Sequence, residues 1–248
     1  VLIALTALVG LCFGSFANVL IARIPAGEFV VSPPSHCPHC QHQLGVADLV
    51  PVVSYLWLRG RCRYCQEKIS LRYPLVELAA AGLFVLVYLQ QGWSAGTLAG
   101  WALALILLTS ALTDIDAGII PDLLTYPGMV LGLVVSPWGP GIISSLEGAF
   151  FFGGLFWLLA FISGGGMGGG DIKLAAVIGL FTGLSGALLA LVLAALGGGI
   201  FSLVLVVMGK AGRKTPIKFG PFLALAGMVA FLYAGPIIKW YLAFFSGV

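Results

Sequence analysis

The chain alternates long apolar stretches with short polar ones, and this pattern predicts membrane-spanning helices. A helix needs about 20 apolar residues to cross the roughly 30 Å hydrocarbon core of a bilayer. Stretches near this length predict eight helices: Val1–Ala22, Leu75–Leu89, Gly96–Thr113, Leu123–Val135, Ile142–Ile162, Asp171–Leu184, Gly186–Met208 and Phe219–Phe245. The predicted fold is therefore an all-α polytopic membrane protein with about eight transmembrane helices.

One long polar segment interrupts the pattern between the first two apolar stretches. Residues 23–74 hold four of the five cysteines, all three histidines and half of the twelve basic residues. We therefore expect three parts: a first transmembrane helix at 1–22, a polar insert at 23–74 and a transmembrane core at 75–248. The first stretch lacks a basic start and a small-residue cleavage site, which favours a retained helix over a cleaved signal peptide.

Composition indicates a membrane protein, and the distribution of basic residues predicts its orientation in the bilayer. The chain is 60% hydrophobic and 8% charged, whereas soluble domains are about 45–50% apolar and about 25% charged. If all eight helices cross in alternation, eleven basic residues fall on one side: Arg23, Arg59, Arg61, Arg63, Lys68, Arg72, Lys173, Lys210, Arg213, Lys214 and Lys218. Because Lys and Arg mark the cytoplasmic side, we expect the insert and the loops at 114–122 and 164–171 to face the cytoplasm.

The insert carries two C-x-x-C units with a repeated pattern. The first contains Cys37, Cys40, Gln41 and Leu44, and the second contains Cys62, Cys65, Gln66 and Ile69 at the same spacing. Four thiolates from two such turns can surround Zn²⁺ as a tetrahedron, and four protein ligands make such a zinc ion structural. Disulfides and metal-free thiols are the alternatives. Cytoplasmic thiols stay reduced, so the predicted orientation favours zinc.

Acidic residues gather at the ends of predicted helices. Asp114, Asp116 and Asp122 lie within one short stretch, and Asp171 follows the glycine-rich segment Gly164–Gly170. A carboxylate at the edge of hydrocarbon is costly unless it is paired, hydrated or functional. Each aspartate alone also fits a capping or loop residue. Glu77 and Glu147 are weaker candidates for a functional role.

Two aspartates on different helices, at one membrane face, are what acid–base hydrolysis by paired carboxylates requires. One carboxylate, ionised, takes a proton from water. The other, protonated, polarises the scissile carbonyl. The sequence therefore indicates a hydrolytic site that needs no catalytic serine, histidine or metal.

Six motifs occur in one order between residues 14 and 174. They are Gly14-Ser15-Phe16-Ala17-Asn18-Val19, Ser35-His36-Cys37-Pro38-His39-Cys40, Leu58-Arg59-Gly60-Arg61-Cys62-Arg63-Tyr64-Cys65, Arg72-Tyr73-Pro74-Leu75-Val76-Glu77, the Asp114–Asp122 stretch and Met167-Gly168-Gly169-Gly170-Asp171-Ile172-Lys173-Leu174. With these motifs the chain resembles the type IV prepilin peptidases, of the bifunctional leader peptidase and N-methyltransferase kind. The last motif contains the G-x-G-D signature, which also marks presenilin-type intramembrane aspartyl proteases.

The resemblance implies an activity and the residues that perform it. The catalytic pair would be Asp114, seven residues before Pro121, and Asp171, which closes G-x-G-D. The implied reaction is cleavage of a prepilin or pseudopilin leader after a Gly, at the cytoplasmic face of the bacterial inner membrane. Methylation of the new N-terminal residue, with S-adenosylmethionine as donor, would follow. The four cysteines match the zinc-ribbon insert that the family ties to methylation.

The implied partners are prepilins or pseudopilins with an N-terminal leader and a hydrophobic helix, and the lipid bilayer, but no nucleic acid. No glycine-rich dinucleotide-type motif is present, so the sequence assigns no residues to the methyl donor. A G-x-G-D protease of other substrates, without methylation, is one alternative, but it needs no four-cysteine insert. An ion-coupled transporter is another, but it would place its aspartates near mid-membrane, whereas Asp114 and Asp171 are expected at helix ends.

Overall fold

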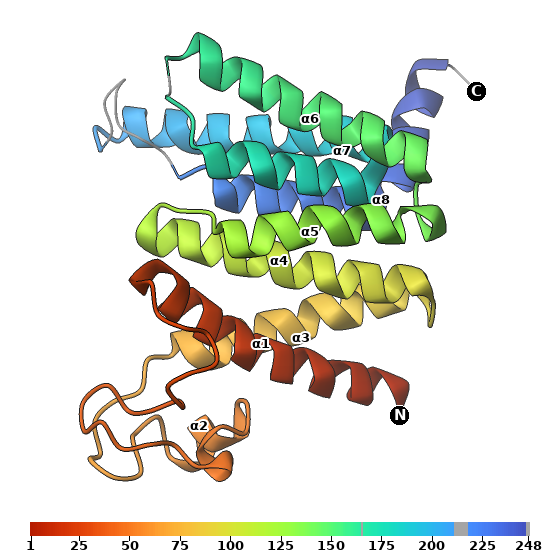
Figure 1. Ribbon diagram of the computed structural model, residues 1–248. Coiled ribbons are helices and arrows are strands. Elements are labelled where there is room, and N and C mark those ends of the chain that lie inside the picture. The colour runs from red at the N-terminus through yellow and green to blue at the C-terminus, as the bar shows by residue number, and fades with distance from the viewer. Residues whose placement is uncertain (165, 211–217, 247–248) are drawn as a thin grey trace. The chain divides into compact units, whose positions relative to one another are not determined.

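The computed structural model describes residues 1–164, 166–210 and 218–246, and nearly all of them outside the insert are helical (Figure 1). The chain forms two compact units, Val1–Trp93 and Ser94–Val248. Six helices are long and apolar enough to cross a membrane. They are α1 (Leu2–Ala26), α3 (Arg72–Gln91), α4 (Ala95–Ala117), α6 (Ile142–Ile162), α7 (Gly169–Val207) and α8 (Gly220–Ser246).

In the first unit, α1 packs closely against α3. A Cβ atom at Gly14 would lie 2.6 Å from the Cα atom of Glu77, so the helix backbones approach as only small residues allow. The side chain of Asn18 also donates to the carbonyl of Tyr73 at 3.0 Å. The insert leaves the membrane helices after Gly27, whose φ of 70° ends α1. It contains the 3₁₀ turn η1 (Val46–Asp48) and the short helix α2 (Val53–Trp57).

In the second unit, α4 to α8 pack as a bundle. The helix α4 begins at Ser94, whose hydroxyl accepts the N–H of Thr97, and ends at Gly118 with a φ of 69°. The shorter helix α5 (Asp122–Val135) follows, and the 3₁₀ turn η2 (Ser136–Trp138) leads to α6. The helix α7 contacts α4, α5, α6 and α8.

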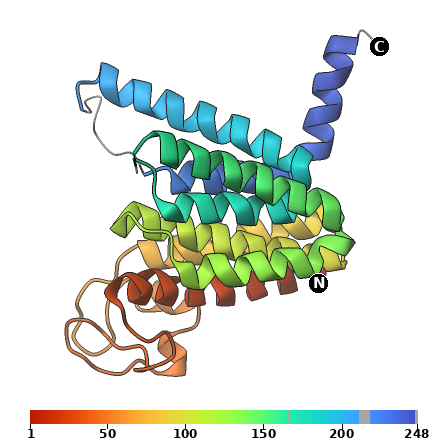
Figure 2. The same ribbon diagram turned by 45° about the horizontal axis from the view of Figure 1, so that its top comes forward.

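The predicted helices at 171–184 and 186–208 are both present as the two arms of α7, which meet at Gly183. This residue has a φ of 68° and a ψ of −176°, and the chain turns back there (Figures 1 and 2). The predicted helix at 123–135 corresponds to α5, whose 14 residues extend about 21 Å. Since α5 is shorter than the roughly 30 Å hydrocarbon core, eight crossings remain a prediction. Arg213 and Lys214, which contributed to the predicted orientation, lie outside the described residues.

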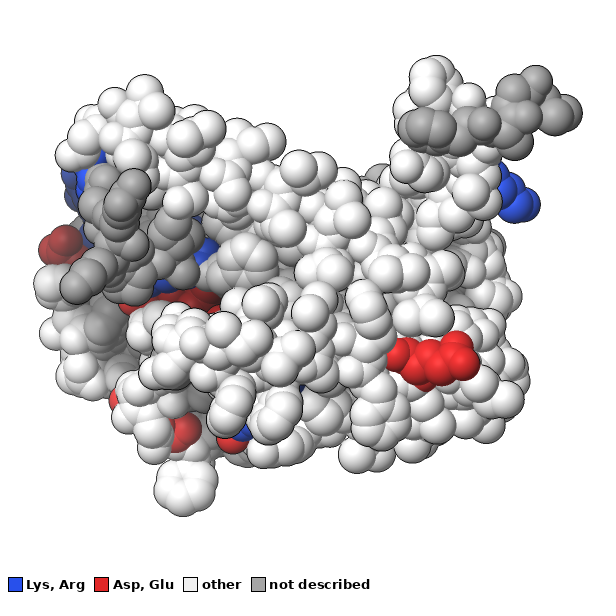
Figure 3. Space-filling view, turned by 90° about the horizontal axis from the view of Figure 1, so that it is seen from above, with Lys and Arg blue, Asp and Glu red and all other residues white. Residues whose placement is uncertain are grey.

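The outward face of the second unit is suited to lipid. Viewed over α6, α7 and α8, it is almost entirely uncharged (Figure 3). Large apolar side chains are exposed on α6, including Phe150, Trp157 and Phe161. Glu147 is an exposed acidic residue near the start of the same helix. This surface agrees with the membrane location expected from composition.

Candidate active site and metal centre

Asp114 lies in the last turn of α4. The residue is 7% exposed, and its Oδ2 atom accepts a hydrogen bond of 2.9 Å from the backbone N–H of Gly220. Gly220 is the first residue of α8, where unpaired N–H groups complement a negative charge. A Cβ atom at Gly220 would lie 2.7 Å from the same carboxylate oxygen. The close approach of α8 to Asp114 therefore depends on glycine at this position.

Asp171 lies in the first turn of α7, directly after the glycine-rich segment. Its backbone N–H donates to the carbonyl of Gly168 at 3.1 Å. The Oδ1 atom of its side chain is buried and has no hydrogen-bond partner among the described residues. A buried carboxylate oxygen without a partner is costly, so a proton, a water molecule or a substrate group is needed to satisfy it.

The two aspartates share one site although they stand 57 positions apart in the chain. The helices that carry them, α4 and α7, are in contact. The loop after α4 also reaches the glycine-rich segment, because a Cβ atom at Gly170 would lie 2.7 Å from the Cβ atom of Ile120. Neighbouring carboxylates resist simultaneous ionisation and share one proton. This arrangement can perform acid–base hydrolysis.

The other two aspartates of the acidic stretch have different surroundings. Asp122 begins α5 and accepts a hydrogen bond of 2.5 Å from Nζ of Lys173, which also lies over the ring of Tyr126 at 4.9 Å from its centre. This ion pair joins the start of α5 to the start of α7. Asp116 is exposed. The interpretation of Asp122 as a residue that shapes the loop fits its ion pair.

The sequence patterns did not identify two residues that lie near Asp114. Gly220 supplies the N–H described above from 106 positions along the chain, and Lys218 donates from Nζ to the carbonyl of Ile115 at 2.5 Å. The sequence placed Lys218 only in a basic loop. The one available signal was Gly220-Pro221 at the start of an apolar stretch, which marks the beginning of a helix but gives no partner for it.

The four predicted zinc ligands lie together in the insert. The Sγ atoms of Cys37, Cys40, Cys62 and Cys65 are all within 4.8 Å of one another, and those of Cys37 and Cys65 are 3.8 Å apart. Thiolates bound tetrahedrally to zinc at about 2.3 Å are about 3.8 Å apart, whereas a disulfide requires about 2.05 Å. A backbone hydrogen bond from Cys40 lowers the pKa of the Cys37 thiol to about 6. At Cys65 a backbone hydrogen bond from Glu67 acts in the same direction, but burial and the other three thiols outweigh it and raise the pKa to about 12. The cluster therefore fits zinc.

The two C-x-x-C units have the same backbone structure, in agreement with their repeated sequence. In each, the N–H of the first cysteine donates to the carbonyl five positions later, from Cys37 to His42 at 3.0 Å and from Cys62 to Glu67 at 2.8 Å. The glutamine after each second cysteine has a positive φ, 58° at Gln41 and 61° at Gln66. Each unit thus presents its two thiols from the same kind of turn.

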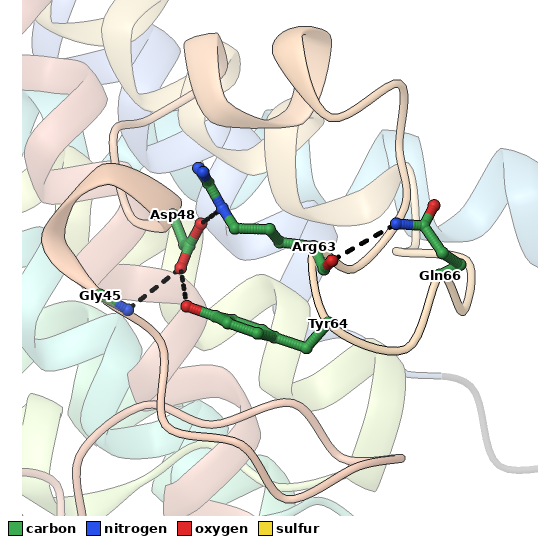
Figure 4. Close-up of polar contacts among 5 residues, drawn as sticks. All are labelled: Gly45, Asp48, Arg63, Tyr64 and Gln66. Carbon is green, nitrogen blue, oxygen red and sulfur yellow. Dashed lines mark hydrogen bonds and ion pairs between the residues drawn. The ribbon is translucent and has the colours of Figure 1, made fainter.

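A polar network around Asp48 joins η1 to the second C-x-x-C unit (Figure 4). The Oδ1 atom of Asp48 accepts from Nε of Arg63 at 2.7 Å, and Oδ2 accepts from the hydroxyl of Tyr64 at 3.2 Å and the N–H of Gly45 at 3.1 Å. Burial alone would raise the pKa of Asp48, but these hydrogen bonds, chiefly that from Arg63, hold it below its usual value. The network therefore contributes stability above the ordinary aspartate pKa and loses it in acid.

Comparison with known proteins covers both units. Residues 8–91 match the model of the bacterial peptidase A24 N-terminal domain, and residues 101–203 match that of the type IV leader peptidase family. A prepilin leader peptidase/N-methyltransferase of Aeromonas hydrophila is 37% identical over 275 residues, covering 98% of this chain and 94% of that protein.

Proteins of the same description from two other bacteria are also similar. The one from Pseudomonas aeruginosa is 37% identical over 275 residues (96% of this chain, 93% of that protein). The one from Bacillus subtilis is 33% identical over 239 residues (94% of this chain, 95% of that protein). No solved structure matches this chain.

Proposed function

Because the chain belongs to the type IV leader peptidase family, we propose that it removes the leader of prepilins or pseudopilins after a Gly and methylates the new N-terminal residue. S-adenosylmethionine is the methyl donor. We place the protein in the bacterial inner membrane, with the aspartate pair and the cysteine cluster on the cytoplasmic side. The excess of Lys and Arg in the insert and in the loops of that side supports this orientation.

The single observation that carries the peptidase function is the shared site of Asp114 and Asp171. Asp114 is oriented by the N–H of Gly220, which suits it to accept a proton from the attacking water. Asp171 has a buried Oδ1 atom without a hydrogen-bond partner in the described part of the chain, which suits it to hold the shared proton and donate it to the scissile carbonyl. Water then adds to the polarised carbonyl to give a tetrahedral intermediate. Asp114 passes the proton that it took from water to the amide nitrogen, and the C–N bond breaks to release a carboxylic acid and an amine.

The second reaction is proposed for the amine that cleavage releases. Its nitrogen attacks the methyl carbon of the donor as the carbon–sulfur bond breaks, and S-adenosylhomocysteine and a proton leave. Zinc held by Cys37, Cys40, Cys62 and Cys65 would have a structural role, since four protein ligands fill its coordination shell. In this proposal residues 23–74 serve methylation, and the helices within 75–248 that carry and surround the two aspartates serve cleavage.

The test is a cleavage assay with a prepilin peptide and the purified full-length protein, followed by mass analysis of the new N-terminus. Asp114→Asn and Asp171→Asn should each reduce leader cleavage by at least about 100-fold, because general acid–base groups contribute about 10²–10⁴-fold. Asp116→Asn is the matched control, since Asp116 is an exposed neighbour on the same helix, and it should retain most activity. Substantial cleavage by either Asp114→Asn or Asp171→Asn would refute the assignment.

The same assay separates the proposal from its alternative. A protease without methyltransferase activity would give a new N-terminus of unchanged mass in the presence of S-adenosylmethionine. We expect the mass to rise by one methyl group. Since both products are read in one spectrum, each of the two activities is tested independently of the other.

A further inference from the structure

The first unit contains a cavity of about 570 Å³ between α1, α3 and the insert. The helices contribute Ser15, Asn18 and Glu77 to its wall, and the insert contributes Asp48 and Tyr55 among others. Cavities of about 300–1,000 Å³ hold small organic ligands. All the lining residues belong to the first unit, so the cavity is a different site from the aspartate pair.

Glu77 places a buried carboxylate in the wall of the cavity, with 7% of the residue exposed. Its Oε2 atom accepts the N–H of Val52 at 2.7 Å, and the hydroxyl of Ser15 also donates to it. Among the residues that the structure describes, no Lys or Arg forms an ion pair with Glu77. The basic residues of the wall are engaged or exposed: Arg23 donates to the carbonyls of Val30 and Pro33, Arg63 pairs with Asp48, and Lys68 is exposed. A buried carboxylate favours a cation as partner, so the part of the cavity beside Glu77 favours a ligand group that carries positive charge.

The wall holds three other carboxylates, of which Glu28 and Glu67 are exposed and Asp48 already has partners. Asp48 accepts hydrogen bonds from Arg63, Tyr64 and Gly45 (Figure 4). It therefore fixes the shape of the insert rather than contacting a ligand, and Glu77 is left as the group that faces one. Cys37 and Cys62 also line the cavity, so occupation of the metal centre would help to shape it.

We propose that this cavity binds S-adenosylmethionine, with the carboxylate of Glu77 facing its positive charge. This inference rests on the methyltransferase part of the proposed function. The ligand carries a sulfonium and an ammonium group, which complement the carboxylate. It also carries a purine ring, which can pack on the aromatic side chains of the wall, Tyr55 and Tyr73.

The test measures binding of radiolabelled S-adenosylmethionine to the full-length protein and to Glu77→Gln. Glutamine keeps the size of the side chain and an oxygen for the N–H of Val52, but it removes the negative charge. The dissociation constant should rise at least about tenfold, while leader cleavage stays at the wild-type rate. Glu147→Gln removes an exposed carboxylate of the second unit and should bind the donor as the wild type does.

A second variant keeps the test valid if Glu77→Gln fails to fold. Ser54 lines the cavity from α2, and Ser54→Phe should obstruct binding without changing Glu77. Photo-crosslinking of the radiolabelled donor should label peptides from residues 1–93. Wild-type affinity in both variants, or a label confined to 94–248, would overturn the cavity assignment. A wild-type protein that cleaves leaders but neither binds the donor nor methylates would instead overturn the methyltransferase function.

Discussion

At the scale of single residues, the position of Asp114 depends on a residue that has no reactive group. Gly220 brings its N–H to the carboxylate because it lacks a side chain. A Cβ atom there would lie 2.7 Å from Oδ2 and 3.0 Å from both Cβ and Cγ of Asp114. Such distances are well inside van der Waals contact, so either the carboxylate or the start of α8 must move.

Gly220→Ala should therefore reduce leader cleavage by about 100-fold, because displacement of a reacting group by about 1 Å can cost that much. Gly235→Ala is the matched control, since Gly235 lies in the same helix and a Cβ atom there would have no neighbour within 4 Å. It should cleave at close to the wild-type rate. Steady-state cleavage of a prepilin peptide measures both variants, and wild-type activity of Gly220→Ala would show that the orientation of Asp114 does not need this contact.

At the scale of elements, the sequence predicts those structures that depend on residues close together in the chain. The apolar stretch Ile142–Ile162 coincides with α6, and the repeated C-x-x-C units have equivalent backbone hydrogen bonds. Other long-range pairs could not be predicted in this way. Asp48 meets Arg63, and Asp122 meets Lys173, only because the chain folds back on itself. The repeated C-x-x-C units predicted that their four cysteines meet, but no such pattern links Asp48 to Arg63 or Asp122 to Lys173. These contacts and the cavity beside Glu77 therefore required the structure.

The two C-x-x-C units are short turns, and the described residues of the insert contain only brief helices to support them. We expect zinc to supply much of the insert's stability, since structural zinc contributes about 10–16 kcal/mol in small zinc domains. Joint replacement of Cys37 and Cys62 by Ser should abolish zinc binding and make residues 23–74 sensitive to protease. Metal analysis and limited proteolysis measure the two effects.

Cys12→Ser is the control for that experiment, because Cys12 is exposed on α1 and lies outside the cluster. It should keep the zinc content and protease resistance of the wild type. Equal zinc content in Cys12→Ser and in the doubly substituted protein would show that the cysteine cluster does not bind zinc.

At the scale of the whole molecule, the two proposed reactions use different units. The cysteine cluster and the cavity belong to Val1–Trp93, and both aspartates belong to Ser94–Val248. The matches to the two family models, at residues 8–91 and 101–203, follow the same division. Losses of methylation and of cleavage should therefore be separable by substitution. The aspartate pair and the proposed methyl-donor site must face the same side of the membrane, however, because cleavage produces the amine that is methylated.

The prediction that both sites face the same side of the membrane can be tested at α5, the shortest predicted crossing. Ile119 and Trp138 are exposed residues that flank this helix, so they should lie on opposite sides of the membrane if α5 crosses it. In spheroplasts, a membrane-impermeant maleimide should label Trp138→Cys but not Ile119→Cys. Glu28→Cys, in the insert, should be protected like Ile119→Cys. Peptide mass mapping reads each position separately.

Permeabilised spheroplasts provide the control for that labelling, because the reagent should then reach Ile119→Cys and Glu28→Cys as well. The pattern of protection distinguishes the ways in which the topology could be wrong. Equal labelling of Ile119→Cys and Trp138→Cys would show that α5 does not cross. Labelling of Ile119→Cys with protection of Trp138→Cys would invert the orientation. Protection of Ile119→Cys with labelling of Glu28→Cys would separate the insert from the aspartate loop, and cleavage and methylation could not then occur on one face.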